Sequence, residues 1–115
     1  MTDTEQVVDV AALMDRLEGD RELLQELVAL YLEDEPGLLD QIARAVDSKD
    51  ADALRRSAHT LKGSVGNFCA PGAHAAALAL EDAGRSGELK AASVLFDRLR
   101  QELVSVRVAL TGLVA

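Results

Sequence analysis

The residues best suited to chemistry surround His59, in the run Ala-His-Thr-Leu-Lys-Gly-Ser at positions 58–64. A neutral imidazole has a ring-nitrogen lone pair that can attack an electrophile such as phosphorus. Lys62 follows His59 by three residues, so on a helix its ammonium lies about one turn away and can reach a group carried on the ring. The spacing therefore indicates a nucleophilic histidine with a cation beside it to stabilise a bound phosphoryl group.

Two glycines share the helical face of His59. With about 100° of rotation per residue, Gly63 and Gly66 fall within about 40° of His59, whereas Leu61 and Val65 fall on the opposite side. A glycine inside a helix costs roughly 1 kcal/mol relative to alanine, so two of them on one face require a reason. We expect them to let a partner surface approach the imidazole. The alternative is that they make room for a neighbouring helix of the same chain.

The composition indicates packed helices and no sheet. Hydrophobic residues make up 49% of the 115 residues but aromatic residues only 3%, so Leu, Val and Ala must form the core. No β-branched stretch alternates with polar residues between hairpin turn signals. We expect a single all-α domain over residues 1–115, an antiparallel four-helix bundle with a short additional N-terminal helix, in which residues 1–8 form a flexible segment.

Turn residues and the spacing of apolar residues divide the chain into helices. Asp9, Asp20 and Asp50 are expected N-caps, each placed just before a periodic apolar segment. Pro36 should mark a kink or a fresh start within the second helix. The expected elements are a short helix at 9–17, a Leu-rich helix from 20 to about 47, the helix of His59 at 50–67, a turn at 69–72, an alanine-rich helix at 73–85 and a long last helix at 92–113.

Charge and cysteine content exclude several classes of function. The net charge of -8 argues against a general binder of nucleic acid or anionic membranes, so the expected partner is a protein. The apolar pattern leaves no obvious unpaired helix face, and the expected state is a monomer. Cys69 is the single cysteine, which rules out an intramolecular disulfide. Together with His59 and His74 it shows no metal-ligand spacing, and His74 is expected to be a surface or packing residue. The chain is expected to be cytoplasmic.

The stretch from Ala58 to Phe68, Ala-His-Thr-Leu-Lys-Gly-Ser-Val-Gly-Asn-Phe, resembles the signature of the histidine-containing phosphotransfer (HPt) family. The resemblance implies a four-helix bundle with an exposed phospho-accepting histidine and no kinase activity of its own. It also implies that the phosphoryl group arrives from an aspartyl phosphate on a response-regulator receiver domain or a hybrid sensor kinase and passes to another receiver. The partner is expected to supply Mg²⁺, and this chain no cofactor.

The same resemblance suggests further site residues. In several members of the family, a polar residue 22 positions after the histidine hydrogen-bonds its Nδ1 or the phosphate, and a basic residue four positions later lies near the site. Glu81 and Arg85 occupy these positions here. Glu81 would orient His59 and Arg85 would contact the phosphate or the receiver, although an ordinary surface pair on one helix is the alternative. Arg55 and Arg56 would join the two glycines in docking the partner.

Two other functions fit the residues. One is the phospho-accepting domain of a chemotaxis-type histidine kinase, which receives its phosphoryl group from an ATP-binding domain. The other is a helical adaptor that keeps the fold without using His59, or binds a metal instead. The joint presence of His59, Lys62 and Gly63 favours phosphotransfer over the adaptor.

Overall fold

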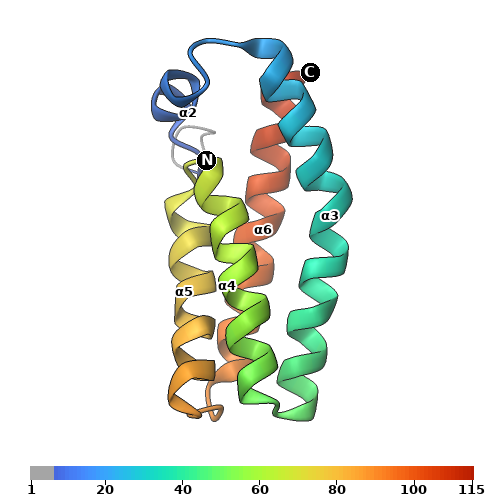
Figure 1. Cartoon of the computed structure of the whole chain (residues 1–115), viewed down its shortest axis with the longest axis vertical. Coiled ribbons are helices and arrows are strands. Elements are labelled where there is room, and N and C mark those ends of the chain that lie inside the picture. Colours follow the sequence, from blue (N-terminus) through green and yellow to red (C-terminus); the bar gives the residue numbers. More distant parts are fainter. Residues whose placement is uncertain (1–6) are drawn as a thin grey trace.

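The computed structural model describes residues 7–115, and these fold into helices without a strand among them. Figure 1 shows the long helices side by side, with successive helices running in opposite directions, and the short helix near the ends of the green and yellow helices. The all-helical prediction is confirmed. The helices are α2 (Val10–Arg16), α3 (Arg21–Ser48), α4 (Ala51–Asn67), α5 (Pro71–Ser86) and α6 (Ala92–Val114).

Three helices begin where the sequence predicts, because an aspartate caps each one. Asp9, Asp20 and Asp50 accept a hydrogen bond from the backbone N–H three residues later, each at 3.0 Å. Such caps satisfy an otherwise unpaired donor and contribute about 1 kcal/mol each. The cap at Asp50 fixes the start of α4, the helix that bears His59.

Both prolines lie within helices, which corrects the turn predicted at Pro71 and rules out a fresh start at Pro36. Pro71 occupies the first turn of α5, where no N–H is needed, so Pro71 and Gly72 belong to the helix and the expected turn is shorter. Pro36 lies inside α3, and the helix continues through it, so no fresh start occurs there. Figure 1 shows α3 as one continuous bowed element. Buried residues on both sides of Pro36, such as Val28 and Ile42, hold the two halves in one core.

The core lies between the four long helices and consists mainly of leucine, valine and alanine. Of the segment predicted to be flexible, residues 1–6 lie outside the described part of the chain, and Val8 is fully buried. Helix α5 has buried alanines and packs extensively on α4; small side chains allow helices to approach closely. The largest side chains with no exposed surface are Leu13, Ile42, Leu54, Leu61, Leu80, Leu99 and Leu110.

The short helix α2 is joined to the end of α4 by hydrogen bonds. The guanidinium of Arg16 donates to the carbonyls of Gly66 and Asn67, at 3.1 and 3.4 Å. The N–H of Asp9 donates to the carbonyl of Cys69 at 2.8 Å. The Asn67 carbonyl is one that the last turn of a helix leaves without an intrahelical partner, whereas the Gly66 carbonyl also accepts from the N–H of Cys69 at 3.1 Å. Helix α2 therefore sits beside the C-terminal end of the helix that presents His59.

Candidate functional site

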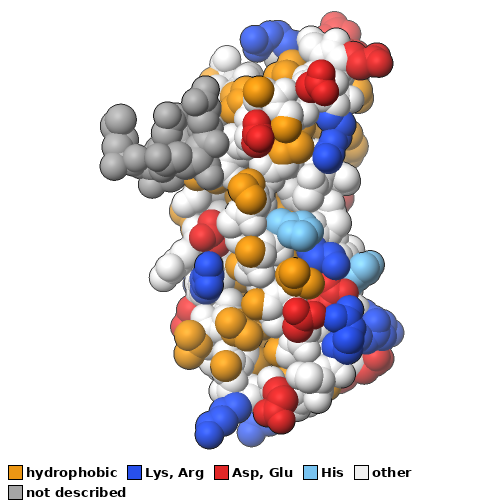
Figure 2. Space-filling model, turned by 90° about the vertical axis from the view of Figure 1, so that its left-hand side faces the viewer, with side chains coloured by type: hydrophobic (Ala, Val, Ile, Leu, Met, Phe, Trp, Pro, Cys, Tyr) orange, Lys and Arg blue, Asp and Glu red, His pale blue; other side chains and the backbone are white. Residues whose placement is uncertain are grey.

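His59 points to solvent from the outer face of α4. Its side chain is 64% exposed, whereas Ala58 and Leu61 on the same helix are fully buried. The outward orientation follows from the apolar spacing of α4, which fixes the face that packs on the core. Figure 2 shows histidine side chains on this side of the molecule, with lysine or arginine and carboxylate side chains gathered nearby.

Glu81 reaches His59 from the neighbouring helix α5. Its side chain is only 3% exposed, and Oε2 lies 2.8 Å from Nδ1 of His59. The Lys62 ammonium, more than the hydrogen bond from His59, lowers the pKa of the Glu81 carboxyl to about 2, against the opposing effect of desolvation. The carboxylate is thus ionised at neutral pH and can only accept, so Nδ1 must carry the hydrogen. In a neutral ring this leaves the lone pair on Nε2.

Lys62 contacts the other oxygen of the same carboxylate. The Nζ of Lys62 lies 2.7 Å from Oε1 of Glu81, and the Lys62 side chain is 22% exposed. The contact is an ion pair whose angles fall outside those of a good hydrogen bond. Because Lys62 and His59 both project from α4, Glu81 is held from two points one turn apart. The ammonium predicted to serve a phosphoryl group is therefore bound to a carboxylate in this structure.

Arg85 completes the cluster. One guanidinium nitrogen donates to Oε2 of Glu81 at 3.0 Å and another to Asp82 at 2.7 Å. The structure thus brings together His59, Lys62, Glu81 and Arg85, the four residues predicted for the site. A single buried carboxylate holds one imidazole N–H, one ammonium and one guanidinium.

The residues predicted to dock a partner have different surroundings. A Cβ on Gly63 would meet nothing within 4 Å, so this position is open. A Cβ on Gly66 would lie 3.4 Å from the ring of His74 on α5. Gly66 therefore faces a neighbouring helix of the same chain, which was the alternative to an approach by a partner. Arg55 and Arg56 are exposed in part, and both form ion pairs with Asp52, at 2.9 and 3.1 Å.

The comparisons with known proteins identify the family and a similar fold. A model of the Hpt domain family matches residues 26–109, most of the chain. The chain belongs to the Hpt domain family. Its fold also matches the crystal structure of histidine-containing phosphotransfer protein B from Pseudomonas aeruginosa PAO1, with a TM-score of 0.73 and 30% sequence identity over 89% of this chain and 86% of that one. A search of the curated proteins finds no significant match.

The role of the Hpt domain is histidine phosphotransfer within a phosphorelay. Other features of the described residues suggest no competing centre. No group of three or more histidine, cysteine or acidic side chains among residues 7–115 is arranged to hold a metal ion, and no helix of that part is long and apolar enough to cross a membrane.

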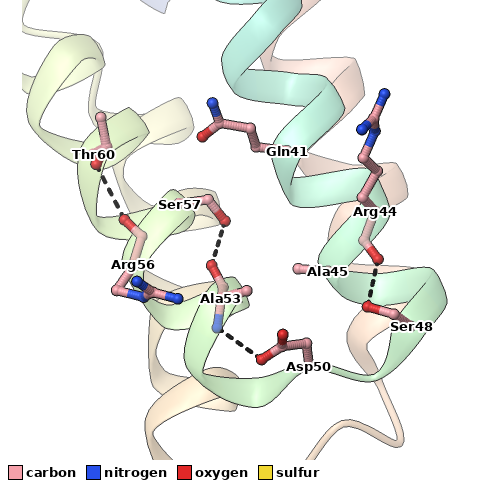
Figure 3. A pocket seen from close by; sticks show the side chains of 9 residues that line it. All are labelled: Gln41, Arg44, Ala45, Ser48, Asp50, Ala53, Arg56, Ser57 and Thr60. Atoms are coloured by element: carbon pink, nitrogen blue, oxygen red, sulfur yellow. Dashed lines mark hydrogen bonds between the residues drawn. The ribbon is translucent and has the colours of Figure 1, made fainter.

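A hollow of about 430 Å³ lies between α3 and α4 (Figure 3). The hydroxyls of Ser48, Ser57 and Thr60, which line it, each donate to the carbonyl four residues earlier in their own helix. Arg44 on its rim is paired with Asp40 at 2.9 Å. These hydroxyls and the Arg44 guanidinium are therefore engaged within their own helices, and the hollow has no exposed histidine among its lining residues.

Two features of the site in this Hpt domain escaped the sequence reasoning. One is the ion pair between Lys62 and Glu81, which depends on how α5 packs on α4 and leaves no signal in local spacing. The other is Gly84, which lies in the last turn of α5 and is buried against α4. The cost of glycine in a helix is a signal that could have indicated it.

Proposed function

We propose that His59 is the phospho-accepting residue of this Hpt domain and that Nε2 is the reactive atom. The observation that supports this most directly is the hydrogen bond from Nδ1 of the exposed imidazole to the ionised, buried Glu81. That bond fixes the tautomer with its lone pair on Nε2, away from the carboxylate. The role of Glu81 resembles that of carboxylates which orient metal-bound histidines.

In the proposed reaction, the Nε2 lone pair attacks the phosphorus of an aspartyl phosphate on a receiver domain. The bond from phosphorus to the aspartate oxygen breaks as the N–P bond forms, and the aspartate leaves as a carboxylate. The ring gains positive charge while it keeps the Nδ1 hydrogen, and the Glu81 carboxylate stabilises that charge. The reverse step, with a second receiver, returns the lone pair to Nε2.

Lys62 and Arg85 are proposed to stabilise the charge of the phosphoryl group. Lys62 lies within one turn of His59 on α4, and Arg85 lies about one turn from Glu81 on α5. Both cations are bound to Glu81 in this structure. Lys62 can reach the phosphoryl group by exchanging one anionic partner for another. Because phosphoryl transfer depends chiefly on positioning and on electrostatic stabilisation, a preorganised pair of cations is a useful arrangement.

The partners are proposed to be receiver domains of response regulators or of a hybrid sensor kinase, and the receiver is expected to supply the Mg²⁺. The open position at Gly63, with Arg55 and Arg56 one turn before His59, provides the approach to the imidazole. The architecture proposed for this role is the antiparallel four-helix bundle with its short N-terminal helix. We further propose that the chain acts in the cytoplasm as a monomeric phosphocarrier without kinase activity.

The assignment is tested by transfer from a receiver preloaded with ³²P-phosphate. We expect an acid-labile, alkali-stable label, as a phosphoramidate gives, and its complete loss in His59→Gln. His74→Gln is the matched control, because it removes the other histidine, also exposed and on the adjacent helix, and should leave labelling unchanged. A label that persists in His59→Gln, or one that is lost in His74→Gln, would contradict the assignment.

A further inference from the structure

Gly84 lies where α5 rests directly on the backbone of α4. A Cβ at this position would lie 2.6 Å from the backbone N of Arg55, 2.7 Å from the carbonyl oxygen of Ala51 and 2.9 Å from the Cα of Arg55. These are backbone atoms, which cannot rotate away as the end of a flexible side chain can. At residue 84, α5 can therefore approach α4 this closely only in the absence of a side chain.

The close contact is one helical turn from the site. Gly84 follows Glu81 by three residues on α5, and Arg55 precedes His59 by four on α4. Because α4 and α5 run in opposite directions (Figure 1), the contact between Gly84 and Arg55 and the contact between Glu81 and His59 are neighbouring steps of one interface. The separation of the helices at the first contact sets the distance available at the second.

The bond between Glu81 and His59 depends strongly on that distance. It measures 2.8 Å, and a separation of about 3.6 Å no longer counts as a hydrogen bond. Arg85 on α5 also holds Oε2 of Glu81 and would move outward with that helix, so this contact opposes the reach of the carboxylate back to His59. A Cβ at residue 84 requires a shift of this size, since its nearest contacts fall well short of ordinary van der Waals distances.

We infer that Gly84 is a positioning residue for phosphotransfer. It sets the separation between α4 and α5 that keeps Glu81 within hydrogen-bonding distance of Nδ1 and so fixes the reactive tautomer of His59. The inference rests on the proposed function of His59. Gly84 acts through Glu81 and does not itself touch the phosphoryl group.

The test is Gly84→Ala, with two readouts. The first is the rate of transfer from a phosphorylated receiver, which should fall about 10- to 100-fold, the effect expected when a reacting group is displaced by about 1 Å. The second is the tautomer of His59, read from ¹⁵N imidazole shifts at a pH where the ring is neutral. The fraction with hydrogen on Nδ1 should drop. Gly37→Ala is the matched control: a Cβ there meets nothing within 4 Å, so neither readout should change.

A cycle with Glu81→Ala, which removes the acceptor for Nδ1, separates positioning from general loss of packing. If Gly84 acts through Glu81, Gly84→Ala should change the transfer rate less than twofold in the Glu81→Ala background. An undiminished loss in that background would overturn the inference. So would a wild-type rate and an unchanged tautomer in the single variant.

Failure of the proposed function has a different signature, because the wild-type protein and Gly37→Ala would then accept no label at all. The tautomer measurement still tests Gly84 in that case. Circular dichroism establishes that each variant is folded. If Gly84→Ala is too unstable to fold, it is combined with Gly37→Ala, which should strengthen α3 because alanine favours helices more than glycine does. If the double variant is still unfolded, the role of Gly84 is purely structural and the inference is overturned.

Discussion

The two carboxylate oxygens of Glu81 contact three groups: His59 and Arg85 form hydrogen bonds with Oε2, and Lys62 forms an ion pair with Oε1. Before phosphorylation the cations therefore neutralise a buried carboxylate, which would otherwise be costly to place there. When the imidazole gains a phosphoryl group, the same cations have a second anion within reach. Glu81, which orients His59, therefore also holds Lys62 and Arg85 close to the position of the phosphoryl group.

The ionised form of Glu81 makes the stability of the domain depend on pH. The Lys62 ammonium lowers its folded-state pKa from 4.5 to about 2. A depressed carboxyl pKa stabilises the fold above the unfolded-state value, and that contribution is lost as the pH falls through the folded-state value. We expect the free energy of unfolding of the wild type to fall more steeply than that of Glu81→Gln between pH 4.5 and about 2. Urea titrations at several pH values measure this, and parallel curves would show that Glu81 does not contribute.

At the scale of helices, the sequence predicts the features that depend on residues close together in the chain. The aspartate caps and the face of α4 opposite His59 depend on residues three or four positions away, so spacing alone located them. The contact between Glu81 and His59 spans 22 positions and was accessible only through the family resemblance. Gly66 and Gly84 could not be interpreted from spacing, because their roles depend on which helix lies over each glycine.

Pro36 is the clearest conflict between local preference and packing. A proline inside a helix removes one backbone hydrogen bond and costs about 3 kcal/mol, partly offset because it also restricts the unfolded chain. Pro36 is exposed, so its removal should disturb no core contact. We expect Pro36→Ala to raise the free energy of unfolding by about 2 kcal/mol, measured by urea denaturation. A loss of stability in Pro36→Ala would instead show that the bundle requires the bend in α3.

At the scale of the whole molecule, an ion pair closes the bundle by joining its first and last long helices. Arg107 on α6 donates to Glu35 on α3 at 3.2 Å, across 72 positions of sequence. The side chain of Glu35 is 8% exposed and that of Arg107 is 42% exposed. Tyr31, one turn before Glu35, has its pKa raised above the usual range by burial and then by Glu35, so its hydroxyl stays protonated. Arg107 is therefore the cation that compensates the buried carboxylate.

Removal of Arg107 should leave Glu35 as an uncompensated buried charge. Breaking a fully buried pair costs about 3–5 kcal/mol, and because Arg107 is partly exposed we expect Arg107→Ala to cost about 2 kcal/mol of unfolding free energy. If the cost arises from the stranded charge, Glu35→Gln should recover stability in the Arg107→Ala background while it destabilises the wild type. Urea denaturation of the four proteins measures the coupling between the two residues. A cost below about 0.5 kcal/mol for Arg107→Ala, typical of an ordinary surface position, would mean that apolar packing alone holds α6 against α3.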